Sequence, residues 1–255
     1  MSFYSYMKIG VTERGDPSLD KTWYEKLMQC DGGIIITKNL NVTLQDKILS
    51  HSRPITIHAT CTGWGGSKME PNVPEPEDQL DNVEFILERG FPEERMVIRI
   101  DPIIPTEEGL KRARRVLELL ERSGLSNLRV RVSVYDEYKH AAARLPEPIY
   151  GGAFSPPKEM LQEVVKLLKS FDREYEICAE PYLAACGHPF KIQGCVSVVD
   201  LKRMGLEQKE HPLTDAEFTI NPQQRSGCKC LGVKQELLST RGRCEHKCLY
   251  CYWKD

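Results

Sequence analysis

The sequence predicts an α/β fold in which a parallel sheet forms a partial (β/α)6-type barrel of the TIM-barrel kind. Short runs rich in Ile and Val recur along the first 180 residues. Several are apolar almost without alternation, which is typical of strands buried on both faces. Longer segments with helically spaced apolar residues lie between these runs. Repeated strand–helix–strand units form parallel sheets with right-handed crossovers, so the two observations together predict this fold class.

Six segments are expected to form strands, and most of them end in polar residues. They are, in order, Lys8–Thr12, Gly33–Thr37, Ile55–Thr60, Met96–Asp101, Leu128–Val134 and Tyr175–Ala179. Barrels carry their chemistry on the loops that follow the strands. The polar residues at these ends are therefore candidates for a site, and the alternative for each is a helix cap or a turn residue.

Four segments are expected to form helices between the strands. They are Asp20–Cys30, Glu77–Arg89, Glu108–Ser123 and Pro157–Phe171. Gly90 and Gly124 follow the second and third of these as stop signals, and prolines begin the fourth. Their leucines and valines lie on one face at helical spacing and are expected to belong to the core.

The chain is expected to divide near residue 180. Residues 1–180 would form the partial barrel, and residues 181–255 a loop-rich cysteine region that completes the barrel within one structural unit. Leu145–Pro157 holds four prolines and two glycines, so this stretch is expected to be irregular.

Composition limits the classes of function. The 255 residues carry a net charge of −2, which gives no global attraction to nucleic acid. No apolar run approaches the roughly 20 residues of a membrane span. The N-terminus lacks the features of a signal peptide, so a cytoplasmic protein is expected. In a reducing compartment, ten cysteines indicate metal binding or catalysis rather than disulfides.

Five of the ten cysteines lie in the last twenty-eight residues, and Cys244, Cys248 and Cys251 form a C-x3-C-x2-C motif. Three thiolates can hold three irons of a four-iron cluster and leave the fourth iron open. A structural zinc site is the alternative, because Cys248 and Cys251 form a knuckle and Cys228-Lys-Cys230 lies nearby in the chain.

Further segments carry a resemblance to a known family. They are Ile36-Thr37-Lys38-Asn39, Thr60-Cys61-Thr62-Gly63, Met69-Glu70-Pro71-Asn72-Val73-Pro74 and Arg99-Ile100-Asp101-Pro102-Ile103-Ile104-Pro105, in this order. With the terminal motif, the chain resembles the spore photoproduct lyase-like branch of the radical S-adenosylmethionine (radical SAM) proteins. It is most similar to a group in that branch whose members end in a cysteine cluster. The resemblance covers residues 8–135 and 221–253.

The order of the motifs departs from the usual members of this family. There the cluster motif follows the first strand, whereas here it comes last. A circular permutation reconciles the two orders, since domain termini often lie close together. Val233–Ser239 would then be the strand before the cluster loop, and it would pair beside Lys8–Thr12.

The resemblance implies cofactors and roles for residues. A [4Fe-4S] cluster would bind to Cys244, Cys248 and Cys251, and S-adenosylmethionine would bind to its open iron. The remaining residues implied in cofactor binding are Tyr250 against the adenine, Thr12 and Glu13 at the methionyl amine, Lys38 at the carboxylate, and Thr60, Arg99 and Asp101 near the ribose or substrate.

Other cysteines are candidates for a second site. Cys178, Cys195, Cys228 and Cys230 could hold an auxiliary iron–sulfur cluster or zinc, with Cys186 as an alternative ligand. The simpler interpretation of Cys178 and Cys195 is that they are small buried apolar residues. Cys61, at a strand end, is a candidate for returning a hydrogen atom during catalysis.

The resemblance implies an enzyme that cleaves S-adenosylmethionine reductively to a 5′-deoxyadenosyl radical, which abstracts hydrogen from an organic substrate. The expected substrate is a small molecule or nucleotide, and the resemblance favours a nucleobase, a nucleotide or a nucleic acid. The net charge does not itself indicate a nucleic acid. A reductase or flavodoxin-type partner would supply the electron. The alternatives are modification of a peptide or amino-acid-like metabolite, and a zinc-stapled binding protein without catalysis.

Overall fold

The computed structural model describes residues 7–207, 227–239 and 244–253. Eight strands form one parallel sheet in these ranges. They are β1 (Ile9–Val11), β2 (Gly32–Thr37), β3 (Ile55–Thr60), β4 (Met96–Ile103), β5 (Arg129–Val134), β6 (Tyr175–Ile177), β7 (Phe190–Ile192) and β8 (Lys234–Glu236). The predicted α/β class with a parallel sheet is thus confirmed.

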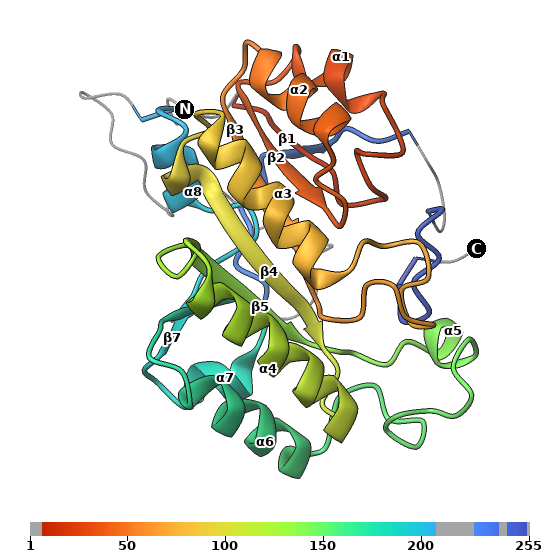
Figure 1. Cartoon of the computed structure of the whole chain (residues 1–255). Coiled ribbons are helices and arrows are strands. Elements are labelled where there is room, and N and C mark those ends of the chain that lie inside the picture. Colours follow the sequence, from red (N-terminus) through yellow and green to blue (C-terminus); the bar gives the residue numbers. More distant parts are fainter. Residues whose placement is uncertain (1–6, 208–226, 240–243, 254–255) are drawn as a thin grey trace.

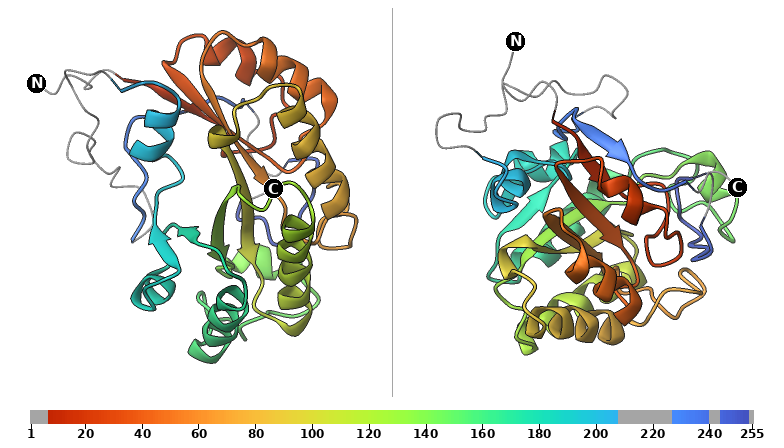
Figure 2. Two further views of the ribbon diagram at one scale, coloured as in Figure 1. Left: turned by 60° about the vertical axis from the view of Figure 1, so that its left-hand side comes forward. Right: turned by 90° about the horizontal axis from the view of Figure 1, so that it is seen from above.

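The strand order across the sheet is β7-β6-β5-β4-β3-β2-β1-β8, so only β8 leaves the order of the chain. Each of the six predicted strand segments overlaps an observed strand, although β2 begins one residue earlier and β4 ends two residues later than predicted. β8 pairs with β1 in parallel, with Ile9 opposite Lys234, as predicted for Val233–Ser239. Figure 2 shows this strand beside β1 although more than two hundred residues separate them in the chain.

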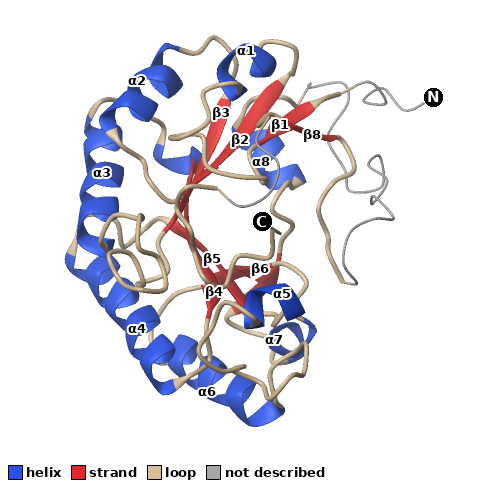
Figure 3. Cartoon of the chain, turned by 90° about the vertical axis from the view of Figure 1, so that its right-hand side faces the viewer, coloured by secondary structure: helices blue, strands red, loops and turns tan. Residues whose placement is uncertain are grey.

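Most of the helices lie on the outer face of the curved sheet, whereas α8 (Val198–Arg203) lies on its inner side, as Figure 3 shows. The helices are α1 (Trp23–Leu27), α2 (Val42–Ser50), α3 (Pro76–Glu88), α4 (Glu107–Arg122), α5 (Lys139–Ala142), α6 (Lys158–Lys169), α7 (Pro181–Ala185) and α8 (Val198–Arg203), with a 3-10 turn η1 (Glu93–Arg95). The four predicted helices are present, the first of them shorter than expected. α2 was not predicted, and its N-cap Asn41 accepts a hydrogen bond from the Leu44 N–H at 2.9 Å.

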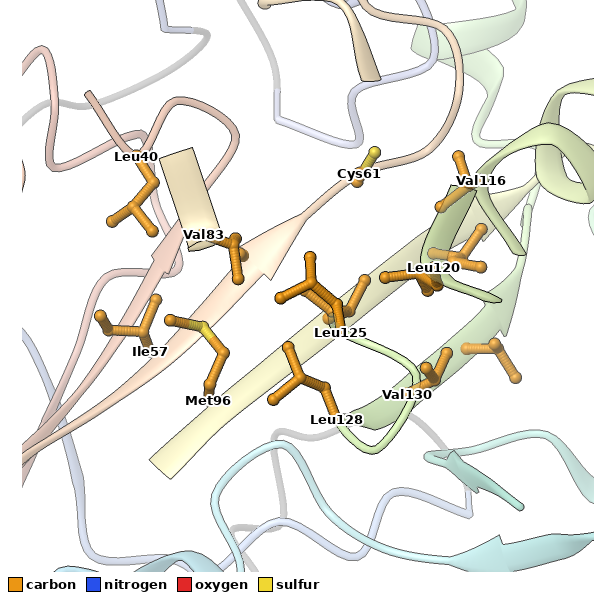
Figure 4. Close-up of a cluster of buried hydrophobic side chains, with 14 of the residues drawn as sticks. Leu40, Ile57, Cys61, Val83, Met96, Val116, Leu120, Leu125, Leu128 and Val130 are labelled. Atoms are coloured by element: carbon orange, nitrogen blue, oxygen red, sulfur yellow. The ribbon is translucent and has the colours of Figure 1, made fainter. Parts of the chain in front are cut away.

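The main core lies between the sheet and the outer helices (Figure 4). Ile57, Met96 and Val130 from three neighbouring strands belong to one buried cluster with Val83 of α3 and Val116 of α4. Full burial of such a side chain contributes roughly 1.5–3 kcal/mol. Because this face is sealed, a ligand site has to lie on the inner face of the sheet.

A second apolar cluster fills the inner face near the start of the strands. Ile9 of β1 and Ile34 of β2 pack with Leu201 of α8. Gly32, the first residue of β2, lies against Met204 just after α8, and a Cβ there would meet its sulfur at 3.1 Å. α8 therefore plugs the N-terminal end of the barrel.

Buried ion pairs extend this plug. Arg129 lies 2.8 Å from Asp200 of α8, and Arg131 lies 2.6 Å from Glu176 of β6. All four side chains are largely withdrawn from water and form ion pairs across the interior. On the opposite side of this plug, a cavity lies at the carboxyl ends of the strands.

The sheet does not close by strand pairing in the ranges the structure covers. β7 and β8 are its two edges. One backbone hydrogen bond, from the Leu231 N–H to the Val196 carbonyl at 2.9 Å, joins the segments next to these edges. None of the described helices is both long and apolar enough to span a membrane.

Candidate functional site

A cavity of about 510 Å³ opens at the carboxyl ends of the strands. Polar residues at the ends of five strands line it, as the barrel prediction requires. These residues are Thr12, Glu13, Thr37, Lys38, Thr60, Arg99, Asp101, Tyr135 and Asp136. The wall also contains all three terminal cysteines and the four cysteines of the second group: Cys178, Cys195, Cys228, Cys230, Cys244, Cys248 and Cys251.

The loop between β3 and α3 holds the terminal cysteine motif in place. The Leu249 N–H donates to the Met69 carbonyl at 3.0 Å, and the Asn72 side-chain amide donates to the Glu245 carbonyl at 2.6 Å. His246 Nδ1 lies 2.7 Å from the Asn72 carbonyl, which can only accept, so this nitrogen carries the proton. In Figure 1 the terminal segment lies beside this loop.

A buried acid, Asp16, anchors the motif from the other side. Its carboxylate accepts hydrogen bonds from the Thr37 hydroxyl at 2.8 Å and the Lys38 N–H at 2.7 Å. His246 Nε2 lies 3.1 Å from the same carboxylate. Burial opposes both charges, yet the pair lowers the pKa of Asp16 and raises the pKa of His246. An ion pair therefore links the cysteine loop to the ends of β1 and β2.

Glu70 is the centre of a second buried network. It is 1% exposed and accepts hydrogen bonds from Lys38 Nζ at 2.6 Å and from the Thr62 hydroxyl at 2.8 Å. The Tyr250 hydroxyl also donates to Glu70, and Lys38 Nζ lies 2.7 Å from that hydroxyl. Burial lowers the pKa of Lys38, but Glu70 outweighs it and holds the pKa above its usual value. Lys38 is thus a fixed cation beside the motif.

The last described residues pack against the end of β1. Trp253 Nε1 donates to the Glu13 carbonyl at 3.1 Å. Arg144, which follows α5, donates to the carbonyls of Cys251 at 2.6 Å and Trp253 at 2.8 Å. The predicted neighbourhood of the motif, Thr12–Glu13 and Lys38, is where the structure places it.

Four more polar residues of the cavity wall form two ion pairs. Arg99 pairs with Asp101. The carboxylate of Glu13 lies 3.0 Å from Lys234 Nζ of β8. The wall therefore carries matched charges of both signs and no single-sign surface in this region.

The second group of cysteines comes together closely. Cys178 follows β6, Cys195 follows β7, and Cys228 and Cys230 precede β8. The Cys178 sulfur lies 3.8 Å from the sulfur of Cys228 and 3.8 Å from that of Cys230. The sulfurs of Cys178, Cys195 and Cys230 all lie within 4.8 Å of one another. Contacts with the neighbouring thiols lower the pKa of Cys178, so the group readily holds a thiolate.

Cys186, the alternative ligand, does not belong to this group. It caps the C-terminal end of α7 and packs against the main core, outside the wall of the cavity. Among the described residues, no other three ligand atoms of His, Cys, Asp or Glu lie within 4.8 Å of one another. The sulfurs of Cys244, Cys248 and Cys251 therefore do not form a group as close as that of Cys178, Cys195 and Cys230.

The structure places Cys61 outside the wall of the cavity, which corrects the prediction that it could return a hydrogen atom during catalysis. Cys61 is 4% exposed and belongs to the apolar core between sheet and helices (Figure 4). Burial is the main cause that raises its pKa to about 12. Successive residues of an extended chain face opposite sides, so Thr60 lines the cavity and Cys61 faces the helices.

Sequence reasoning missed two residues that organise the site, Glu70 and Asp16. Glu70 stands within the quoted Met69–Pro74 segment, so the signal was present without a role attached to it. Asp16 lies between glycine and proline, where an acid is usually a turn residue. Only the folded contacts distinguish these acids from solvated ones.

Comparison with known proteins gives one match. A family model described as a domain of unknown function, DUF1848, matches residues 3–253. No curated protein and no solved structure matches the chain.

Proposed function

The chain belongs to the DUF1848 family, and we propose that it is a radical SAM enzyme whose [4Fe-4S] cluster is held by Cys244, Cys248 and Cys251. One observation carries the proposal. Three thiols of a C-x3-C-x2-C motif line a cavity at the strand ends, and their sulfurs do not all lie within 4.8 Å of one another. A four-iron cluster on three thiolates leaves one iron for the amine and carboxylate of S-adenosylmethionine.

The surroundings of the motif suit such a cofactor. Burial raises the pKa of the Cys248 thiol, and the positive charge of Lys38 opposes this shift. Because the raised pKa of Lys38 keeps it cationic, it can neutralise the carboxylate of S-adenosylmethionine. The Tyr250 ring lines the cavity, where an adenine can stack, while Glu70 fixes its hydroxyl.

The cofactor supplies the difficult chemistry when bound: one electron breaks a carbon–sulfur bond of S-adenosylmethionine, and the deoxyadenosyl fragment takes a hydrogen atom from the substrate. The protein residues bind and orient the cofactor and the substrate, and they exclude water from the cavity. Thr12 and Glu13 lie at the strand end nearest the terminal motif, a place for the methionyl amine. Arg99 and Asp101, deeper in the cavity wall, are positioned to contact ribose or substrate.

The strand order supports a circularly permuted barrel as part of the proposal. β8 supplies the strand before the cluster loop and joins the sheet beside β1. In the usual order of this family, that strand would come first. Apart from β8 the strands follow chain order, which is what moving one strand from the start to the end of a chain produces.

The cavity favours a small organic substrate. Its volume lies in the range of roughly 300–1,000 Å³ that is typical of small-molecule pockets. A nucleobase or nucleotide is the substrate class proposed, and an amino-acid-like metabolite is the alternative. A reductase or flavodoxin-type protein would deliver the electron.

Anaerobic reconstitution tests the proposal. The wild-type protein, reduced with dithionite and given S-adenosylmethionine, is expected to release 5′-deoxyadenosine and methionine. Cys248→Ala is expected to lose the iron of this site and all product above background. Cys30→Ala is the matched control, because Cys30 is similarly buried but lies between α1 and β2, outside the wall of the cavity. A colourless wild-type protein that holds only zinc, or full cleavage by Cys248→Ala, would refute the enzyme and favour a zinc-stapled binding protein.

A further inference from the structure

The four-cysteine group sits where the sheet fails to close. Cys178 and Cys195 follow the strands at the β7 edge, whereas Cys228 and Cys230 precede β8 at the opposite edge. One backbone hydrogen bond, Leu231 to Val196, joins these edge segments within the described ranges. The thiols therefore gather at the seam of the barrel.

The distances between the sulfurs distinguish a site for a single metal ion from a site for a four-iron cluster. Tetrahedral zinc–thiolate sites have Zn–S bonds of about 2.3 Å, which places their sulfurs about 3.8 Å apart. In a four-iron cluster each thiolate binds a different iron, and the sulfurs stand roughly 6 Å apart. The Cys178 sulfur lies 3.8 Å from the sulfurs of both Cys228 and Cys230, and the sulfurs of Cys178, Cys195 and Cys230 lie within 4.8 Å of one another. The Cys228 sulfur does not lie within 4.8 Å of all three, so Cys228 is the ligand that has to move inward to complete a tetrahedron.

We infer that Cys178, Cys195, Cys228 and Cys230 bind a single zinc ion in a tetrahedral thiolate site, and that this ion closes the barrel by joining its two edges. The site differs from the proposed cluster site, although both face the same cavity. Soft thiolates in tetrahedral geometry are the ligands that zinc prefers.

Positive groups offset the charge of such a site. Four thiolates and one zinc ion carry a net charge of −2. Arg99 Nη2 lies 3.9 Å from the Cys195 sulfur, and the Cys195 N–H donates to the Cys230 sulfur at 3.1 Å. Lys234, four residues after Cys230, also faces the cavity. Donors to metal-bound sulfur of this kind orient ligands and stabilise their charge.

The backbone around the thiols allows the close approach that one ion requires. Gly194 precedes Cys195, and a Cβ there would stand 2.4 Å from the Lys229 carbonyl oxygen. Gly227 has φ of 79° and lies against Ala179, which itself has φ of 57°. Such a conformation is unfavourable for alanine and is held only where surrounding structure enforces it.

Metal analysis of the full chain tests the inference separately from the enzymatic proposal. The wild type is expected to contain one zinc per chain by mass spectrometry of metals. Cys195→Ser and Cys228→Ser are expected to lose it, whereas Cys228→His, which restores a zinc ligand, retains it. Cys186→Ser is the matched control outside the group. Cys248→Ala should lose iron only, so failure of the cluster proposal leaves the zinc result unaffected.

A measurement on the wild type covers the case in which the serine variants do not fold. X-ray absorption at the zinc edge is expected to show four sulfur neighbours at about 2.3 Å. Zinc bound by nitrogen or oxygen, zinc retained by Cys195→Ser, or joint loss of iron and sulfide from that variant would each overturn the inference.

Discussion

The two cysteine groups share one cavity but are built in opposite ways. Cys244, Cys248 and Cys251 come from a single loop of eight residues, and their sulfurs do not all lie within 4.8 Å of one another. The four-cysteine group comes from three separate segments, and its sulfurs lie 3.8 Å apart where they are closest. The difference teaches that the spacing of thiols, rather than their number, decides what they can hold: a cluster with an open iron, or one closed ion.

The two groups also differ in what depends on them. The terminal motif is fixed by outside contacts, namely Asp16, Asn72 and the Glu70 network, so the fold positions the motif. The four-cysteine group joins the edges of the sheet, so the metal would position the fold. We expect the first group to govern activity and the second to govern stability.

Removing each metal in turn should give the largest contrast. Closure of the 50 residues between Cys178 and Cys228 is worth about 4 kcal/mol by the loop-entropy estimate. Stripping zinc should therefore lower the melting temperature by about 8–16 °C. Destroying the iron–sulfur cluster with oxygen should lower the melting temperature far less, but it should abolish cleavage of S-adenosylmethionine. Calorimetry with parallel metal analysis measures both, and equal shifts would break the contrast between the groups.

Glu70→Gln should cause the next largest loss in the free energy of unfolding. The change leaves the Lys38 cation in a buried site without its carboxylate, and breaking such a pair costs about 3 kcal/mol. Denaturant unfolding should show this loss, and product formation should fall as Lys38 and Tyr250 lose their anchor. Zinc content should not change. Glu107→Ala, which removes an exposed ion pair on α4, is the control and should alter neither property. Loss of zinc in Glu70→Gln would mean that the two groups are coupled.

The sequence alone predicted those parts of the site that are marked by uncommon residues at regular spacing. Thiols at fixed spacing are uncommon, and parallel strands bring their ends to one edge, so both cysteine groups and residues such as Lys38 and Arg99 could be placed in advance. Cys61 was misplaced by one residue along a strand, which reverses the face of the sheet. β7 has only three residues, Phe-Lys-Ile, too few to establish a period. Glu70 resembles any loop acid until its buried partners are known.

Asp16→Asn should have an intermediate effect confined to the terminal motif. The neutral amide cannot form an ion pair with protonated His246. It also has one acceptor oxygen where the carboxylate has two, so it cannot accept from both the Thr37 hydroxyl and the Lys38 N–H as Asp16 does. A loss of about 1–3 kcal/mol is expected, in the range for charged hydrogen bonds. Iron occupancy after reconstitution should fall while zinc stays at one per chain. His51→Gln, at a half-buried histidine-to-backbone contact outside the site, serves as the comparison. Unchanged iron binding would show that the motif does not rely on Asp16.

The smallest effect should come from backbone strain, which both groups contain. Ala179 beside Cys178 and Lys247 beside Cys248 are the only non-glycine residues with positive φ in the described ranges. Glycine there relieves about 1–2 kcal/mol of strain but costs about 0.5–1 kcal/mol in chain entropy. Ala179→Gly and Lys247→Gly should therefore stabilise the protein by up to about 1 kcal/mol in denaturant unfolding. Lys166→Gly within α6 should instead destabilise by about 1 kcal/mol. Ala179→Gly should not destabilise as much as Lys166→Gly. An equal loss would mean that the fold does not enforce the left-handed backbone of Ala179, and that the metal alone must hold this residue in that conformation.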